Sequence, residues 1–159
     1  MRKSSAQKRG RLTVWLLLCF GVPLAAVGFI WLFTMPNVST LKTTNPTTTA
    51  LIESRQVQAK EQGRPIARHW IWVPLNRIPI HLRHAVVAAE DALFFTHEGF
   101  DWEGMKDAAL YDLEKGELKR GGSTITQQLA KNLYLSSERS LLRKAHEALI
   151  TRSLEHHLS

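Results

Sequence analysis

The stretch GGSTITQQLAKN at residues 121–132 contains the clearest helix start signal of this chain. Thr124 and Gln127 stand at the spacing of a capping box, in which each side chain bonds the backbone of the other residue where a helix begins. Ser123, Gln127 and Lys131 recur at four-residue steps and therefore share one face of that helix. The stretch predicts a helix with a hydroxyl, an amide and an ammonium group along one side.

The two glycines that open this stretch follow Lys119 and Arg120. Cations and free backbone N–H groups at a helix N-terminus suit a phosphate ligand, although an ordinary glycine turn would give the same pattern. A nucleotide-binding P-loop is not supported, because that motif requires a lysine after its last glycine and Ser123 follows Gly122 here. The segment is a candidate phosphate site without being a nucleotide site.

Another helix is predicted over residues 79–93, where Leu82, Val86 and Glu90 lie on one face at four-residue steps. A carboxylate thus ends an apolar stripe. A carboxylate that is partly withdrawn from water is a candidate general base, because burial disfavours its charged form. The alternative is a boundary glutamate that turns outward to solvent. Glu90 is therefore a candidate catalytic residue, with both orientations open.

The region between these two helices contains local start and stop signals of a further helix. Asp101 is a predicted N-cap, and Gly116 is a predicted stop. Because the segment between them carries no chemical motif, we interpret it as structural. Together with the other predicted helices, this segment predicts a mainly α-helical fold in which strands are minor.

A last helix is predicted at the C-terminal end of the chain. Ser136 or Ser137 is predicted to cap it. Arg143 and Glu147 share a face that is predicted to lie off the core. The apolar spacing predicts a core side formed by Leu142, Ala145 and Leu149.

The N-terminal part has the pattern of a membrane anchor. Residues 1–11 form a basic tail, and residues 12–33 contain no charged side chain. About 22 helical residues at about 1.5 Å rise cover the roughly 30 Å hydrocarbon core of a bilayer. A cleaved signal peptide is the alternative, but its apolar region is shorter and ends at small residues, whereas large residues occupy positions 30–33. The positive-inside rule then predicts a cytoplasmic N-terminus, with the rest of the chain outside.

The formal charge of +7 is concentrated in this basic tail. Five of the 21 Lys and Arg residues precede Leu12, and the remaining 16 face 14 acidic residues. A nearly balanced body lacks the basic stripe of nucleic-acid-binding proteins, so no nucleic-acid partner is expected. The single cysteine, Cys19, lies within the apolar run and supports neither a disulfide framework nor a cysteine-ligated metal.

Residues 34–65 are rich in Thr, Asn, Pro and Ser and are predicted to form a neck or linker. A short extended segment is predicted over residues 66–75, where Trp70 and Trp72 alternate with other residues. Residues 66–159 follow this neck and contain the predicted helices and candidate residues described above. No internal repeat is visible in the sequence.

Three segments together resemble the signatures of the peptidoglycan glycosyltransferase family. EDALFFTHEGFD at residues 90–101 is similar to the first signature, in which Glu-Asp, a Phe, a His, a Gly and an Asp recur at this spacing. Residues 121–132 resemble the second signature over its whole length, and RKAHE at residues 143–147 resembles the third. Three motifs in order are more specific than one short motif. The anchor followed by a neck is similar to the monofunctional members, the biosynthetic peptidoglycan transglycosylases.

The resemblance implies a lysozyme-like helical glycosyltransferase domain that polymerises a lipid-linked disaccharide-peptide precursor, lipid II, into glycan strands. The transfer would invert the anomeric configuration and release polyprenyl diphosphate. Glu90 is the implied general base, and Glu147 would orient cations or a divalent ion. The implied substrate-binding residues are Asp91, Phe94, His97, Gly122, Ser123, Thr124, Gln127, Gln128, Lys131, Asn132, Arg143 and Lys144.

The resemblance makes no cofactor obligatory and is compatible with a divalent cation, Mg²⁺ or Mn²⁺. The implied partners are lipid II, a polyprenyl-diphosphate-linked glycan strand, the membrane and other cell-wall synthesis proteins. The implied location is the bacterial inner (cytoplasmic) membrane, crossed once, with the catalytic part on the periplasmic side.

The family pattern continues with a lysine-rich helix ending in Glu-x-Tyr-Leu-Asn and with a further motif, so the chain is expected to be C-terminally incomplete. Two other functions stay open from the sequence. One is a lysozyme-like wall-degrading enzyme, which would use its glutamate as an acid on a sugar leaving group. The other is an inactive membrane-tethered module.

Overall fold

The computed structural model describes residues 15, 17–23, 28–29, 35–65, 70–116, 121–138 and 140–158. The chain divides into two compact units, Met1–Pro36 and Asn37–Ser159. In the first unit the described residues include a π-helical turn, η1 (Leu17–Gly21). Most of the predicted membrane span, residues 12–33, lies outside the described residues, so the span stays a prediction. Within the part that the structure describes, no helix has the length and apolar character needed to cross a bilayer.

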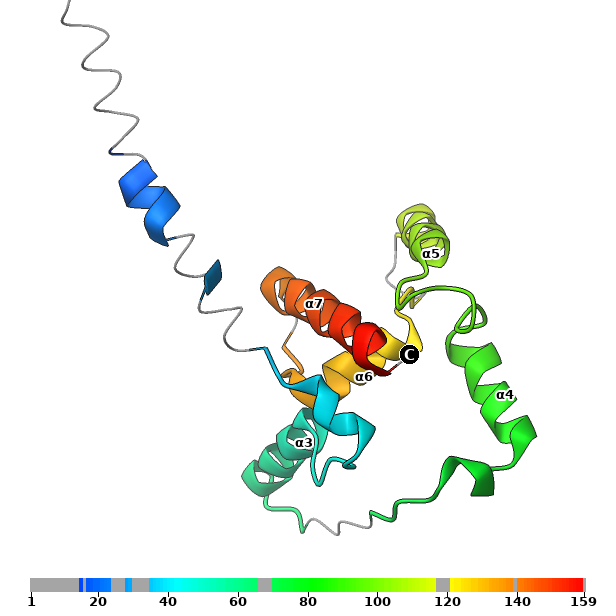
Figure 1. Cartoon of the computed structure of the whole chain (residues 1–159). Coiled ribbons are helices and arrows are strands. Elements are labelled where there is room, and N and C mark those ends of the chain that lie inside the picture. The colour runs from blue at the N-terminus through cyan, green and yellow to red at the C-terminus, as the bar shows by residue number, and fades with distance from the viewer. Residues whose placement is uncertain are drawn as a thin grey trace, which may run out of the picture. The chain divides into compact units, whose positions relative to one another are not determined.

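The second unit is helical, and no strand occurs among its described residues. The mainly α-helical fold class is thereby confirmed. Figure 1 shows its helices in chain order. Their bounds are η2 (Val38–Lys42), α3 (Ala50–Glu61), η3 (Leu75–Arg77), α4 (Ile80–Glu90), α5 (Trp102–Lys115), α6 (Ile125–Tyr134) and α7 (Leu141–Leu158).

The core of this unit forms where α6 lies against α7, with η2 packed on α7 and α3 packed on α6 (Figure 1). Because α6 contacts both long neighbours, it is the central element of the unit. Its small Ala130 is fully buried, which lets the neighbouring helix approach closely. The other buried apolar side chains are Val38, Ala108, Leu135, Ile150 and Leu154.

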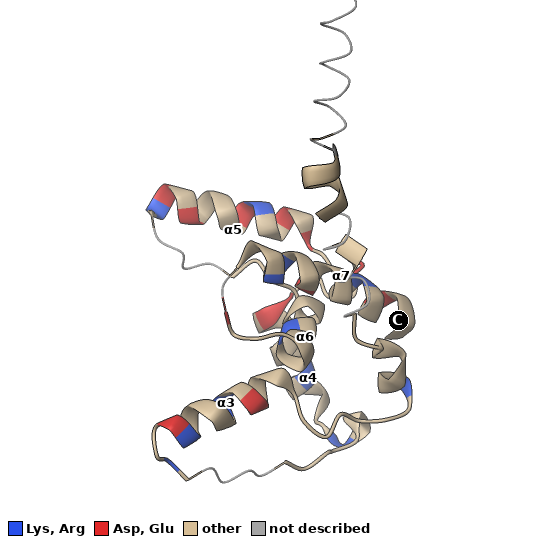
Figure 2. Ribbon diagram, turned by 90° about the vertical axis from the view of Figure 1, so that its left-hand side faces the viewer, with Lys and Arg blue, Asp and Glu red and all other residues tan. Residues whose placement is uncertain are grey.

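The caps of α5 and α6 confirm the local predictions. The Asp101 carboxylate accepts a hydrogen bond from the backbone N–H of Gly104 at 2.8 Å, and α5 ends at Gly116 in the left-handed conformation, with φ +65°. The capping box of α6 is complete: the Thr124 hydroxyl accepts from the Gln127 N–H, and the Gln127 amide oxygen accepts from the Thr124 N–H. Both acidic and basic residues occur along α5 (Figure 2).

Two predictions for the last helix were wrong, namely its N-cap and its buried face. Ser140, rather than Ser136 or Ser137, accepts the backbone N–H of Arg143, and α7 begins at Leu141. Leu142, Ala145 and Leu149, the predicted core side, are exposed. The face that packs on α6 and η2 instead includes Glu147, Ile150, Thr151 and Leu154.

The segment predicted as a neck or linker contains η2 and α3 among its described residues. After a threonine-rich segment, Thr49 caps α3 by accepting the backbone N–H of Ile52 at 3.1 Å, and α3 packs against α6. The Thr, Asn and Pro composition therefore marks helix starts and turns within a packed unit. The structure describes residues 70–74 without regular structure, and η3 follows them at Leu75.

Candidate active site

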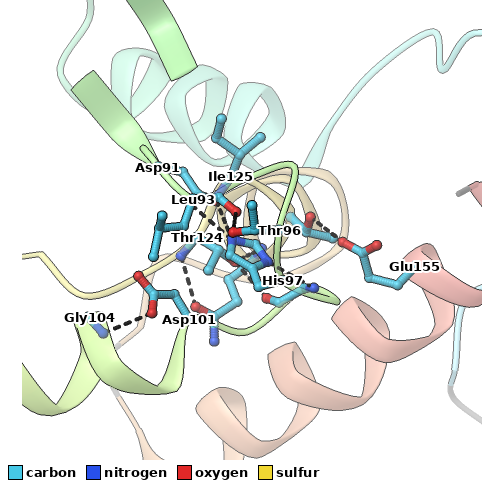
Figure 3. Close-up of polar contacts among 12 residues, drawn as sticks. Asp91, Leu93, Thr96, His97, Asp101, Gly104, Thr124, Ile125 and Glu155 are labelled. Atoms are coloured by element: carbon cyan, nitrogen blue, oxygen red, sulfur yellow. Dashed lines mark hydrogen bonds and ion pairs between the residues drawn. The ribbon is translucent and has the colours of Figure 1, made fainter. Parts of the chain in front are cut away.

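Asp91 connects the loop after α4 to the beginning of α6 through hydrogen bonds. This side chain is only 7% exposed, and its carboxylate accepts hydrogen bonds from the Ile125 backbone N–H at 2.9 Å and from His97 Nε2 at 2.9 Å (Figure 3). A carboxylate at a helix N-terminus is stabilised by the helix dipole. The N-terminus of α6, which the sequence marks as a candidate phosphate site, is therefore occupied by a carboxylate of the chain itself. Lys119 and Arg120 lie outside the described residues.

His97 has both ring nitrogens engaged within this loop. Its Nδ1 accepts the backbone N–H of Gly99 at 3.1 Å, so the proton resides on Nε2, which donates to Asp91. The ring of Phe94 meets the imidazole edge to face, with centroids 6.4 Å apart. The structure thus brings together Asp91, Phe94 and His97, three predicted substrate-binding residues, and their contacts order the loop.

Gly99 lies where this loop passes between α6 and α7. The Thr124 hydroxyl donates to the Gly99 carbonyl at 2.7 Å (Figure 3), and Gly99 has a φ of +83°. A Cβ atom there would lie 2.7 Å from Cγ of Glu155 and 3.1 Å from Cγ2 of Thr151. Only glycine fits this conformation and this close approach.

Glu90, the candidate base, is the last residue of α4 and is exposed. Of the two orientations that the sequence left open, the structure has the outward one, and α4 ends at Glu90 instead of continuing to Leu93. Its Oε2 accepts a hydrogen bond from the Gln128 side-chain amide of α6 at 2.9 Å. The carboxylate is therefore oriented by α6 and remains accessible to a substrate hydroxyl.

Glu147 lies inside the fold rather than off the core, and it is 2% exposed. Its Oε2 accepts from Arg143 Nη1 at 2.8 Å, and its Oε1 accepts from Lys144 Nζ. The Lys144 ammonium also donates to the Ser123 hydroxyl at 3.4 Å. A buried carboxylate requires such compensation by charge, so Glu147 fixes two cations, Lys144 beside the start of α6 and Arg143 at the cavity near its end.

A cavity of about 480 Å³ lies where α3, α6 and α7 meet. Lys131 and Asn132 of α6 and Arg143 of α7 line it, as does Arg55 of α3. The remaining lining residues are Leu51, Ser54, Leu135, Ser136 and Ser137. Arg143 Nε is buried without a hydrogen-bond partner in the described structure, so this guanidinium keeps an unused donor. The lining is rich in cations and hydrogen-bond donors.

Two predicted substrate-binding residues serve the fold in this structure. Gln127 is 1% exposed and its amide oxygen is used in the capping box. A Cβ atom on Gly122 would lie 3.1 Å from Cα of Met105, so Gly122 allows α5 to approach the segment before α6. Their substrate contacts stay predictions.

Sequence reasoning missed Arg55, Ser140, Thr151 and Glu155. The Thr126 hydroxyl donates to Glu155 at 2.6 Å, which adds a second link between α6 and α7. Thr151 and Glu155 lie four residues apart on the helix, and this spacing was the available signal for a polar packing face. No sequence pattern marks Arg55 as a functional residue, because its position at the cavity depends on how α3 packs on α6.

Among the described residues, no three His, Cys, Asp or Glu side chains gather as a metal site would require. Both carboxylate oxygens of Glu147 accept bonds from cations. Glu147 therefore does not fit the part of a divalent-cation ligand, and no chemical step below depends on a metal.

Comparisons with known proteins agree with the three signatures. A family model described as transglycosylase matches residues 56–159. A biosynthetic peptidoglycan transglycosylase of Neisseria meningitidis serogroup C (strain 053442) is 41% identical over 145 residues, which cover 91% of this chain and 61% of that protein. One from Laribacter hongkongensis (strain HLHK9) is 48% identical over 126 residues, which cover 79% of this chain and 54% of that protein. The chain thus spans between 54% and 61% of the length of these relatives.

Proposed function

Because this chain belongs to the transglycosylase family, we propose that it polymerises a lipid-linked disaccharide-peptide precursor, lipid II, into peptidoglycan glycan strands. The observation that carries the proposal is the arrangement around α6. This helix orients Glu90 through Gln128. Lys144 lies beside its start through Ser123, and Lys131 is part of its last turn. A carboxylate and a set of cations are the groups that a transfer from a diphosphate leaving group requires.

The proposed step joins an acceptor hydroxyl to the anomeric carbon of the donor sugar. The hydroxyl proton moves to Glu90, a new C–O bond forms, and the bond between the anomeric carbon and the diphosphate breaks with its electron pair on the diphosphate. Direct attack inverts the α-linked donor to a β-linked product without a covalent sugar-enzyme intermediate. Lys131, Arg143 and Lys144 stabilise the departing polyprenyl diphosphate, and Glu147 holds the last two in place.

The cations favour this reaction over glycan hydrolysis. A wall-degrading enzyme needs an acid for a sugar leaving group, whereas a diphosphate is already a stable anion and is helped by positive charge. We further propose a lysozyme-like arrangement for the helical domain and anchoring of residues 12–33 in the cytoplasmic membrane. Residues 66–159 would form the catalytic part on the outer face, with residues 34–65 leading to it. The anchor would keep the catalytic part at the membrane surface, where its lipid-linked substrates lie.

The test compares the purified chain with its Glu90→Gln variant in detergent, using lipid II as substrate. Glutamine keeps the size of Glu90 and its contact with Gln128, but it does not accept the proton. We expect single-turnover polymerisation to fall at least about 100-fold, as is typical when a general base is lost, with lipid binding unchanged. Glu98→Gln is the matched control, because Glu98 is exposed in the same loop and forms a surface ion pair with Arg152.

Retention of more than about a tenth of the parental rate by Glu90→Gln would remove Glu90 from the role of base. Release of soluble saccharide from cell walls without polymer formation would instead identify a hydrolase. A parental chain that neither consumes the precursor nor cleaves walls would support an inactive tethered module.

A further inference from the structure

A basic side chain of α3, outside the three signature motifs, faces the cationic cavity between α3, α6 and α7. We propose that Arg55 is a diphosphate-binding residue, which together with Lys131 and Arg143 holds the diphosphate of the lipid-linked donor. This inference rests on the proposed function and adds α3 to the substrate site. It gives residues 50–61 a role in binding beyond that of a connection between anchor and catalytic domain.

The composition of the cavity lining indicates an anionic ligand. Arg55, Lys131 and Arg143 come from three different helices and converge on one cavity, and no carboxylate lines it among the described residues. Hydroxyl groups and an amide that could donate further hydrogen bonds come from Asn132, Ser136 and Ser137. Several cations and neutral donors around one concave space suit a multiply charged oxyanion.

The charge balance favours the same ligand class. Glu147 pairs with Arg143 and partly neutralises it. Arg55 and Lys131 have no ion pair with a carboxylate among the described residues, so their charge is directed at the cavity and solvent. A diphosphate bears more than one negative charge and can contact all three cations at once.

The position of Arg55 follows from local structure. The Thr49 cap starts α3, and Leu51, Ser54 and Arg55 then lie at three- and four-residue spacing on one face. That face lines the cavity, because α3 packs on α6. The Ser54 hydroxyl donates its proton to the Leu51 carbonyl at 2.9 Å, so Arg55 is the group of this face that can donate to a ligand. Arg55 is exposed and is free to bend over a ligand.

A membrane phospholipid headgroup shares part of this chemistry, since it also carries a phosphate. The two sources differ in charge and shape, because a headgroup presents one phosphodiester whereas the donor presents a diphosphate. The cavity volume of about 480 Å³ falls within the range of small-molecule sites rather than of a flat membrane contact. We therefore assign the cavity to the diphosphate.

The test measures binding to the full chain in detergent. The probes are inorganic pyrophosphate, a solubilised polyprenyl diphosphate, and vesicles of phosphatidylglycerol. We expect Arg55→Gln to raise the Kd for both diphosphate probes about tenfold, since a hydrogen bond to a charged group typically contributes that much. Vesicle binding should be unchanged. Lys60→Gln is the matched control, because Lys60 lies on the same helix and carries the same charge but does not line the cavity.

Equal diphosphate affinity for Arg55→Gln and the parental chain would overturn the proposal, as would an equal loss for Lys60→Gln, which would indicate a general effect of charge. Weaker vesicle binding with unchanged diphosphate binding would reassign the cavity to a lipid headgroup. Equal melting temperatures of the two variants and the parental chain exclude unfolding as the cause. If Lys131→Gln weakens diphosphate binding and Arg55→Gln does not, the proposed function stands and only the role of α3 fails.

Discussion

Glu90, Asp91 and Glu147 are three carboxylates in three different environments. Glu90 is at the surface and is oriented by one amide, Asp91 is buried against a helix N-terminus, and Glu147 is buried between two cations. Because a buried carboxylate needs its partners, Asp91 and Glu147 are suited to order the site. Glu90 alone keeps an accessible carboxylate, which suits proton transfer.

Asp91→Asn is expected to destabilise the chain by about 1.5–3 kcal/mol, the range for hydrogen bonds to a charged group. The amide keeps one acceptor for the Ile125 N–H but loses the negative charge at the start of α6 and one acceptor for His97. Urea unfolding followed by circular dichroism measures the free energy of unfolding. Glu98→Gln, an exposed change in the same loop, is expected to stay within about 0.5 kcal/mol of the parental value. Equal stability of the Asp91 and Glu98 variants would contradict a structural role of Asp91.

Sequence reasoning found most of these residues but not all of their environments. The signature segments pointed to Glu90, Asp91 and His97 through their local order in the chain. Glu147 was placed off the core, because charged side chains are rarely buried. Its ion-pair partners Arg143 and Lys144 lie on the same helix. Spacing along α7 does not reveal that this face packs on α6 and η2, which is what buries the carboxylate.

At the scale of helices, α6 and α7 are joined by polar contacts as well as by apolar packing. Thr126 bonds Glu155, and the loop at Gly99 is held between Thr124 and the α7 residues Thr151 and Glu155. These contacts fix the first signature segment against two helices at once. The orientation of Glu90 therefore depends on the packing of α6 and α7 as well as on Gln128.

Gly99→Ala is expected to destabilise this packing by about 1–3 kcal/mol, the cost of a residue held in an unfavourable backbone region. The positive φ disfavours alanine, and its Cβ would press on Glu155 and Thr151. Gly116→Ala is the matched control, because Gly116 also has a positive φ but its added Cβ meets no atom within 4 Å. Thermal unfolding of both variants should show a larger loss for Gly99. An equal loss would mean that only backbone conformation matters at Gly99.

The helix ends that the sequence predicted correctly are those of α5 and α6, which have local caps. Asp101, Gly116 and the pair Thr124 and Gln127 bound α5 and α6 in the structure as in the sequence. The buried face of α7 could not be predicted, because it mixes Glu147 and Thr151 with Ile150 and Leu154 and so lacks an apolar stripe. Apolar spacing selected the opposite side, where Leu142 is 72% exposed.

At the scale of the whole molecule, the basic charge and the apolar run are separated from the folded unit in the sequence. The five basic residues before Leu12 precede a run without charges, and the three signature segments follow only after residue 89. Residues 37–159 form a compact unit of their own. This order suits the proposed function on membrane-embedded substrates, since the proposed anchor would keep the catalytic unit at the surface where they reside.

The last prediction concerns topology. A reporter enzyme that is active only outside the cytoplasm, fused after Ser159, is expected to be active, because the basic flank of residues 1–11 is retained inside by the positive-inside rule. The control replaces Arg2, Lys3, Lys8, Arg9 and Arg11 with glutamine, which removes the charge bias and leaves the apolar run intact. Reporter activity should fall in this variant, since orientation then loses its main determinant. Activity of a cytoplasm-specific reporter at the same fusion point would place the catalytic unit on the wrong side of the membrane for its proposed substrate, and the proposed localisation would have to be abandoned.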